Sequence, residues 1–295
     1  MIPGELRDAL EGVRPDSGVG EPLRISGVTR VSGGSINEAA RLETGTHGTC
    51  FLKWNRAADP DMFRAESLGL EELRAAASGL RIPRTLSFGK TGGTGYLLME
   101  YVEEGSPAGG AAERFGRRLA VQHGHSREQF GLDHDNYIGR LPQSNRAHER
   151  WTDFFREERL EPQVAMAVDD GKLSAEIARA FERLYGKLEE LIPEEPPALL
   201  HGDLWGGNFY WGPDGEAVIY DPAVYYGHRE IEMAFTRLFG GFPAAFYRAY
   251  DEESPLEPGF EDRVDLYNLY PLLVHTNLFG GSYARQVEAI VNRLT

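Results

Sequence analysis

The sequence predicts an α+β fold with two lobes: a small β-rich N-terminal lobe over residues 1–102 and a larger helical C-terminal lobe over residues 103–295. In the first part of the chain apolar and polar residues alternate, which is the period of a half-buried strand. In the second part apolar residues recur every three or four positions, the period of an amphipathic helix. A segment rich in small residues, 103–110, separates the two patterns, and we interpret it as the crossing between the lobes.

The N-terminal lobe is expected to be mostly sheet, with one helix. A Thr-Gly-Thr-His-Gly turn between two alternating segments is a strong hairpin signal. A helix is predicted further on, where apolar residues fall on one face. The expected elements are a first strand at 24–31, the hairpin strands at 37–43 and 49–54, the helix at 61–77, and an apolar strand at 96–102 that leads to the crossing.

The C-terminal lobe is expected to be mostly helical. The clearest helix has a continuous apolar stripe and ends before a cluster of prolines. The apolar Ala198-Leu199-Leu200 follows that cluster. The predicted helices are 113–123, 151–160, 174–191 and a tail, 264–294, that is interrupted by two glycines.

Charge and composition exclude several classes of function. The net charge of −15 argues against a nucleic-acid partner, which would need a basic face, but leaves room for a local site that binds a small anion. The single cysteine, Cys50, excludes an internal disulfide. No stretch approaches the roughly 20 apolar residues that cross a bilayer, so we expect no membrane partner. The N-terminus shows no secretory signal, and we expect a cytoplasmic protein.

One run carries the chemistry: His201-Gly202-Asp203-Leu204-Trp205-Gly206-Gly207-Asn208, followed by a strand-like stretch that ends at Asp221. Phosphoryl transfer needs a carboxylate to orient and deprotonate a hydroxyl, and oxygen ligands to hold Mg²⁺ against ATP phosphates. The spacing His-x-Asp-x-x-x-x-Asn, then a strand and an Asp, is typical of kinase catalytic and metal-binding loops. We therefore predict Asp203 as the general base, with Asn208 and Asp221 as magnesium ligands. The alternative is a turn that uses Asp, Gly and Asn for their turn preference.

A lysine and a glutamate upstream complete this set. Lys53 lies between apolar neighbours in a predicted strand, where a lysine can also extend its ammonium to solvent. Glu66 lies one helical turn from Phe63 and from Leu70, close to the core face. Because an unpaired buried charge is costly, we predict a Lys53–Glu66 pair that holds the ammonium against the ATP phosphates.

Two backbone segments are candidates for the rest of the nucleotide. Gly33, Gly34 and Ser35 lie between the first two strands, where glycines let the backbone approach phosphates. This turn departs from the full glycine-loop and Walker patterns, and an ordinary turn is the alternative. Backbone groups of Glu100-Tyr101-Val102 are expected to bind the adenine edge, unless they are ordinary strand residues.

For the acceptor we single out Trp205, Tyr225, His228 and Arg229, which lie near the predicted base in the sequence. Aromatic faces beside polar groups suit a sugar ring, although they suit core packing equally. His228 and Arg229 could instead form an ion pair with Glu230 or Glu232. After Asp221 there is no Phe-Gly and no Ala-Pro-Glu segment, so the peptide-docking region of protein kinases is not expected and a small-molecule kinase is.

The run 201–208, with Asp-Pro-Ala-Val-Tyr-Tyr-Gly-His-Arg-Glu at 221–230, resembles the fructosamine kinase (ketosamine-3-kinase) family. The Asp loop is shared with aminoglycoside and choline kinases, whereas Trp205 and the Tyr-Tyr-Gly-His-Arg-Glu run are more specific. Further matches are Gly33-Gly34-Ser35-Ile36-Asn37, Phe51-Leu52-Lys53, Asp135-Asn136-Tyr137-Ile138-Gly139, Leu238-Phe239-Gly240-Gly241-Phe242 and Asn277-Leu278-Phe279-Gly280-Gly281.

This resemblance implies ATP-dependent phosphorylation of the C3 hydroxyl of a ketosamine, an amine that carries a rearranged sugar. The 3-phosphate is unstable and sheds the amine, so the family is one of deglycation enzymes. By matching positions, Asp203 is the base, Asn208 and Asp221 hold the metal, and Lys53 and Glu66 position the phosphates. The alternatives are an aminoglycoside- or choline-type kinase and a nucleotide-binding regulator without catalysis. The complete set of site residues disfavours the regulator.

Overall fold

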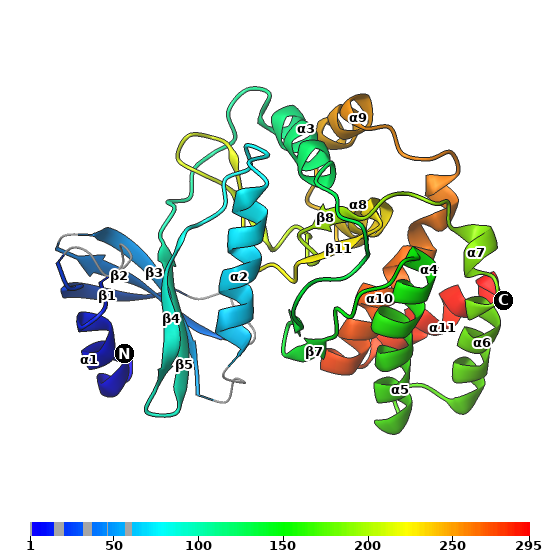
Figure 1. Ribbon diagram of the computed structural model, residues 1–295, viewed down its shortest axis with the longest axis horizontal. Helices are drawn as coiled ribbons and strands as arrows, with labels where there is room; N and C mark the ends of the chain where they lie inside the picture. Colours follow the sequence, from blue (N-terminus) through cyan, green and yellow to red (C-terminus); the bar gives the residue numbers. More distant parts are fainter. Residues whose placement is uncertain (1, 15–20, 32–36, 46, 57–60) are drawn as a thin grey trace.

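The computed structural model describes residues 2–14, 21–31, 37–45, 47–56 and 61–295. An antiparallel five-stranded sheet lies at one end of the molecule and a group of helices at the other (Figure 1). The expected α+β fold is confirmed. In spatial order the strands of the sheet are β1 (Ile25–Val31), β2 (Glu38–Thr44), β3 (Gly48–Asn55), β5 (Thr94–Glu100) and β4 (Thr85–Thr91).

Helices cover both faces of this sheet. On one face, Leu6 and Leu10 of α1 (Gly4–Glu11) pack with sheet residues such as Leu52 of β3. On the other face, Phe63 of α2 (Met62–Ala75) packs with Leu97 of β5. Because side chains alternate along a strand, every second residue of β3 points to the α2 side.

The predicted hairpin is confirmed as β2 and β3, with Thr44 opposite Gly48. The predicted strand at 96–102 is β5, which ends at Glu100. Strand β4 was not anticipated. The expected lobe boundary between residues 102 and 103 falls in the connection from β5 to α3 (Ala111–His123), and it stays a prediction.

The rest of the chain is mostly helical, with three short antiparallel strand pairs. The helices are α4 (Trp151–Phe154), η1 (Phe155–Leu160), α5 (Glu161–Asp169), α6 (Ala175–Tyr185), α7 (Leu188–Leu191), α8 (Arg229–Leu238), α9 (Ala244–Glu253), α10 (Phe260–Phe279) and α11 (Ser282–Leu294). The strand pairs are β6 (Asn136–Ile138) with β7 (Leu141–Gln143), β8 (Ala198–Leu200) with β11 (Tyr225–Gly227), and β9 (Phe209–Trp211) with β10 (Ala217–Ile219).

Two helix predictions need correction. The expected helix over 151–160 is only α-helical to Phe154 and continues as the π-helix η1. Within η1, Arg159 is buried, and its guanidinium lies over the Tyr225 ring and donates to Asn145 Oδ1. A π turn is a local change of helix geometry, and here it accompanies this inward arginine. The expected helix over 174–191 is divided at Gly186, where α6 ends.

The short strand pairs bring two loops together. Backbone hydrogen bonds join Ala223 N–H to His201 O at 2.9 Å and Tyr220 N–H to Asn208 O at 3.1 Å. The loop after β8 and the loop after β10 therefore lie side by side. Across the described ranges, no helix has both the length and the apolar character that crossing a bilayer requires.

Candidate active site

The loop after β8 is held in shape by its own asparagine. The side-chain amide of Asn208 donates from Nδ2 to the backbone O of Asp203 at 2.8 Å and to its carboxylate Oδ2 at 2.9 Å. The five-residue spacing thus closes a compact loop. Because Nδ2 faces Asp203, the amide oxygen of Asn208 is left for another partner.

A second cluster joins three segments that are distant in the sequence. The Lys53 ammonium on β3 donates to both carboxylate oxygens of Glu66 on α2, at 2.8 and 2.9 Å, and to Asp221 Oδ1 at 2.7 Å. Lys53 and Glu66 are nearly buried, with side chains 8% and 11% exposed. Burial alone would lower the pKa of Lys53, but the carboxylates of Asp221 and Glu66 raise it, so the ammonium stays charged.

The backbone at Asp221 supports a special role for this residue. Its φ of +57° lies in the left-handed region, which residues other than glycine rarely adopt. Such a conformation persists only where surrounding contacts hold it, and it is often found at functional sites.

Most of the predicted site residues line one cleft of about 500 Å³. The structure brings into it Lys53, Glu66, Glu100, Tyr101, Val102, Asp203, Trp205, Asn208 and Asp221. Gly33, Gly34 and Ser35, the predicted phosphate turn, lie outside the described residues. The carbonyl of Val102 accepts a hydrogen bond from the Tyr210 hydroxyl at 2.9 Å. The Glu100 carboxylate is bound to the Arg81 guanidinium and to Arg84 N–H, so its side chain is already engaged by the protein.

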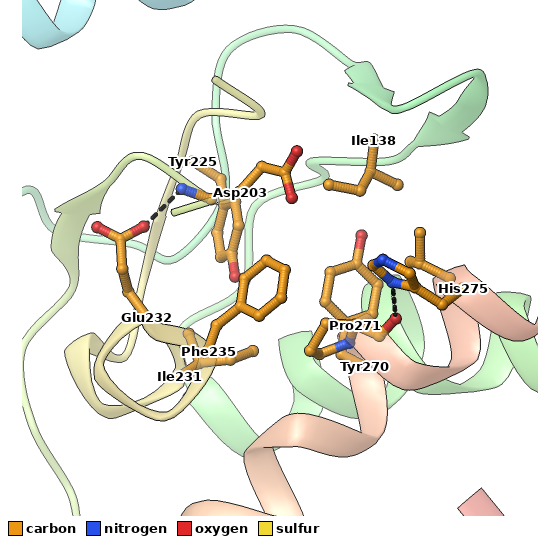
Figure 2. A pocket seen from close by; sticks show the side chains of 11 residues that line it. Ile138, Asp203, Tyr225, Ile231, Glu232, Phe235, Tyr270, Pro271 and His275 are labelled. Atoms are coloured by element: carbon orange, nitrogen blue, oxygen red, sulfur yellow. Dashed lines mark hydrogen bonds between the residues drawn. The ribbon is translucent and has the colours of Figure 1, made fainter. Parts of the chain in front are cut away.

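Asp203 also lines a second, small and mostly apolar pocket of about 20 Å³ (Figure 2). Its walls include Ile138, Phe235, Tyr270 and His275. Asp203 therefore lines both the large cleft and the small pocket. Burial raises the pKa of Asp203 well above its ordinary value, and the nearby Asp221 and Glu232 carboxylates add to this, while the Asn208 amide opposes it.

Glu232 is a site residue that sequence reasoning considered only as an ion-pair partner. Its carboxylate accepts from Gly202 N–H at 2.7 Å and His201 N–H at 3.1 Å, and His123 Nε2 donates to it at 2.9 Å. Burial alone would raise its pKa, but these hydrogen bonds and His123 lower it, so the group is ionised. Glu232 thus anchors the backbone just before Asp203. An acid among the buried residues of α8 was the available signal, since a buried charge needs partners.

Two of the four residues predicted to bind the acceptor line a pocket, and two do not. Trp205 lines the cleft and Tyr225 lines the small pocket, where it is buried and stacked on Phe154 with ring centroids 5.6 Å apart. His228 and Arg229 line neither pocket.

The two residues outside the pockets, His228 and Arg229, lie at the start of α8 and bind other parts of the protein. His228 is fully buried, accepts Glu230 N–H at its Nδ1 and donates from Nε2 to Pro193 O at 3.1 Å. Arg229 forms a bidentate pair with Glu195 at 2.7 and 2.9 Å. Among the described residues neither expected ion pair, with Glu230 or with Glu232, is present. Arg229 pairs with Glu195 instead, because neighbouring positions on a helix point in different directions.

The sheet, the Asp–Asn loop and the Lys–Glu–Asp cluster together define a kinase of the protein-kinase-like fold. Comparison with known proteins agrees. The family model for fructosamine kinase matches residues 15–295. The chain belongs to the fructosamine kinase family, as the sequence resemblance predicted.

Named relatives extend over nearly the whole chain. A protein described as a ketoamine kinase from Synechocystis is 43% identical, with 93% of this chain and 92% of that protein covered. A chloroplastic protein-ribulosamine 3-kinase from Arabidopsis thaliana is 38% identical, with 92% and 84% covered. A crystal structure of a protein assigned as a fructosamine-3-kinase from Thermobifida fusca superposes with a TM-score of 0.83 at 36% identity, covering 92% of this chain and 94% of that one.

Proposed function

We propose that this kinase transfers the γ-phosphoryl group of ATP to the C3 hydroxyl of a ketosamine, with Mg²⁺ as the metal. One observation carries the proposal: Asp203 lines the same cleft as Lys53, Asn208 and Asp221, and backbone hydrogen bonds hold its loop beside the loop of Asp221. A kinase needs the phosphate-binding lysine, the metal ligands and the base in one cleft for in-line transfer. Relatives named for ketoamines and ribulosamines support the substrate class.

The donor side is the large cleft. The Lys53 ammonium, held by Glu66, would bind phosphate oxygens and stabilise the charge that develops during transfer. In the same cleft, the backbone N–H of Val102 has no hydrogen-bond partner among the described residues and is available to the adenine edge. The cleft volume of about 500 Å³ is in the range of ligand pockets.

The metal would be held by Asn208 and Asp221. The chemistry of this donor set fits: the amide oxygen of Asn208 and the second carboxylate oxygen of Asp221 are hard oxygen ligands, the type Mg²⁺ prefers. When bound, the metal would neutralise charge on the ATP phosphates. Asn208 would also hold Asp203, because its Nδ2 donates to that carboxylate.

On the acceptor side, Asp203 would orient the C3 hydroxyl and accept its proton as the O–P bond forms and the bond to ADP breaks. The raised pKa of Asp203 makes it a better proton acceptor than an ordinary carboxylate. The product would be a ketosamine 3-phosphate, which then sheds its amine. Because the donor is ATP, we place this reaction in the cytoplasm.

A coupled ADP-release assay over a small panel tests this proposal. The panel is ribulose-lysine, erythrulose-lysine, fructose-lysine, kanamycin and choline, with and without Mg²⁺. ADP release is expected with at least one ketosamine, only with the metal present, and not in Asp203→Asn. Turnover of kanamycin or choline with none on the ketosamines would reject the substrate class. Full turnover in Asp203→Asn would remove that residue from its role.

A further inference from the structure

A series of aromatic rings runs from the cleft to the molecular surface. Trp205 contacts Phe239 with ring centroids 5.7 Å apart, and Phe239 contacts His275 at 4.9 Å. His275 in turn contacts Phe279 at 5.6 Å and Tyr283 at 5.0 Å. These five residues, here called the aromatic strip, come from the catalytic loop and from the ends of α8, α10 and α11.

The outer part of the aromatic strip is open to solvent. Phe279 is 56% exposed and Phe239 is 38% exposed. Single exposed apolar residues are common, but these two share His275 as a neighbour and form a connected patch. Neither residue was part of the predicted site.

The inner part of the aromatic strip is continuous with the catalytic carboxylate. Trp205 lies two residues after Asp203 and lines the large cleft. His275 lines the small pocket together with Asp203 (Figure 2). Its Nδ1 donates to Pro271 O at 2.7 Å, so Nε2 carries the lone pair. Burial lowers the pKa of His275, and the neutral ring does not repel a cation.

We infer that the aromatic strip binds the ammonium group and alkyl arm of a lysine-linked ketosamine. This inference rests on the proposed function. In a ketosamine only C1 and C2 separate the nitrogen from C3. With the C3 hydroxyl at Asp203, the ammonium lies within a few bond lengths of that carboxylate. Trp205 in the large cleft and His275 in the small pocket are the residues of the aromatic strip that line a pocket together with Asp203.

The chemistry of the two partners is complementary. Aromatic faces attract alkylammonium ions. The lysine methylenes would then follow the apolar rings outward past Phe239 towards Phe279, with the peptide backbone left in solvent. The net charge of −15 favours a cationic substrate over an anionic one.

Two substrates and one exposed phenylalanine test the inference. The substrates are the ribulosamine of methylamine, which has almost no arm, and a short peptide that carries ribulose on a lysine side chain. Phe279→Ala removes the outermost ring, and Phe279→Tyr keeps a ring. Phe88→Ala is the matched control, because Phe88 is 41% exposed and lies on β4.

In Phe279→Ala, KM for the peptide is expected to rise about two- to fivefold, the size of one partly exposed apolar contact with the lysine methylenes. KM for the methylamine substrate, KM for ATP and kcat should stay unchanged, and both Phe279→Tyr and Phe88→Ala should behave as wild type. If the ratio of the two KM values is the same in Phe279→Ala as in the wild type, whether both values stay constant or both rise equally, the inference is overturned and the proposed function is not affected. No turnover of either substrate by the wild type would instead refute the proposed function, and the inference with it.

Discussion

Replacing Glu232 by glutamine tests how the catalytic loop is held. Glu232 is 3% exposed, and its carboxylate accepts from the backbone N–H groups of His201 and Gly202 and from His123. Glutamine has nearly the same shape, but one of its two terminal atoms is an amide nitrogen that donates. One acceptor is therefore lost, and a donor faces a donor at that point.

The size of the effect follows from the contacts. If the amide oxygen keeps His201 N–H, the 2.7 Å bond to Gly202 N–H is lost. A buried N–H without an acceptor costs about 1–3 kcal/mol. For a chain of this size that lowers the melting temperature by about 2–10 °C. Because Gly202 directly precedes Asp203, the base should shift, and misplacement by about 1 Å can reduce turnover on the order of 100-fold.

The assay is a split between kcat and KM, measured well below the melting temperature of the variant. In Glu232→Gln, kcat should fall about 10- to 100-fold. KM for ATP should stay close to wild type, because Lys53 and Glu66 are untouched. Glu261→Gln is the matched control, since Glu261 lies on the surface, with a side chain 75% exposed, and pairs with Arg237.

Two results would refute this reasoning. The first is a Glu232→Gln enzyme with wild-type kcat, which would show that the backbone bonds to His201 and Gly202 do not position the base. The second is a parallel rise of KM for ATP with the fall in kcat, which would indicate general loss of structure rather than a displaced loop.

The other predictions concern the charged groups of the cleft. Asp203→Asn should lose nearly all turnover, keep nucleotide binding in a calorimetric titration and melt at a higher temperature near pH 7. Burial raises the pKa of this carboxyl above its ordinary 3.8, so the folded state holds the proton more tightly than the unfolded chain. At pH values above 3.8, ionisation of this carboxyl therefore destabilises the folded state. The gain should shrink as the pH falls towards 3.8, and a lower melting temperature than wild type near pH 7 would contradict it. In the wild type, kcat/KM should decrease as the pH is lowered, with an apparent pKa above the usual carboxyl range, because the base must be ionised to accept a proton. A value of kcat/KM that stays constant until the pH reaches the usual carboxyl range would contradict a buried base. Lys53→Met should lower kcat/KM for ATP on the order of 100-fold, because the ammonium beside Glu66 and Asp221 is lost, and unchanged kinetics would exclude a phosphate-binding role.

Local patterns in the sequence predicted the elements that build the cleft. The alternation and the glycine turn identified β2 and β3, and helical spacing identified α2. Each of these signals depends on contacts between near neighbours in the chain, so it can be read without the fold. The π-helix η1 was missed, since its inward-facing Arg159 depends on Tyr225, a residue far away in the sequence.

The same distinction holds for the site. Asp203, Asn208 and Asp221 were recognised because kinase chemistry places them at a fixed spacing, and the structure brings them into one cleft with Lys53. His228 and Arg229 carried an equally suggestive local pattern. His228, however, caps α8 and donates to Pro193 O, and Arg229 pairs with Glu195. The sequence does not predict in which direction a side chain at the start of a helix points, because that depends on residues that are distant in the chain.

By itself, the order of residues determined the class of the protein: the Asp–Asn loop, the acid that follows it and the paired lysine are short motifs typical of kinases. Only the tertiary structure decided that Glu232 holds the backbone before Asp203 and that Asp203 lines both a large cleft and a small pocket. It also decided that aromatic rings from three helix ends continue outward from the base. The physical reason is that burial and charge pairing are set by residues far apart in the chain, whose approach only the packed core defines.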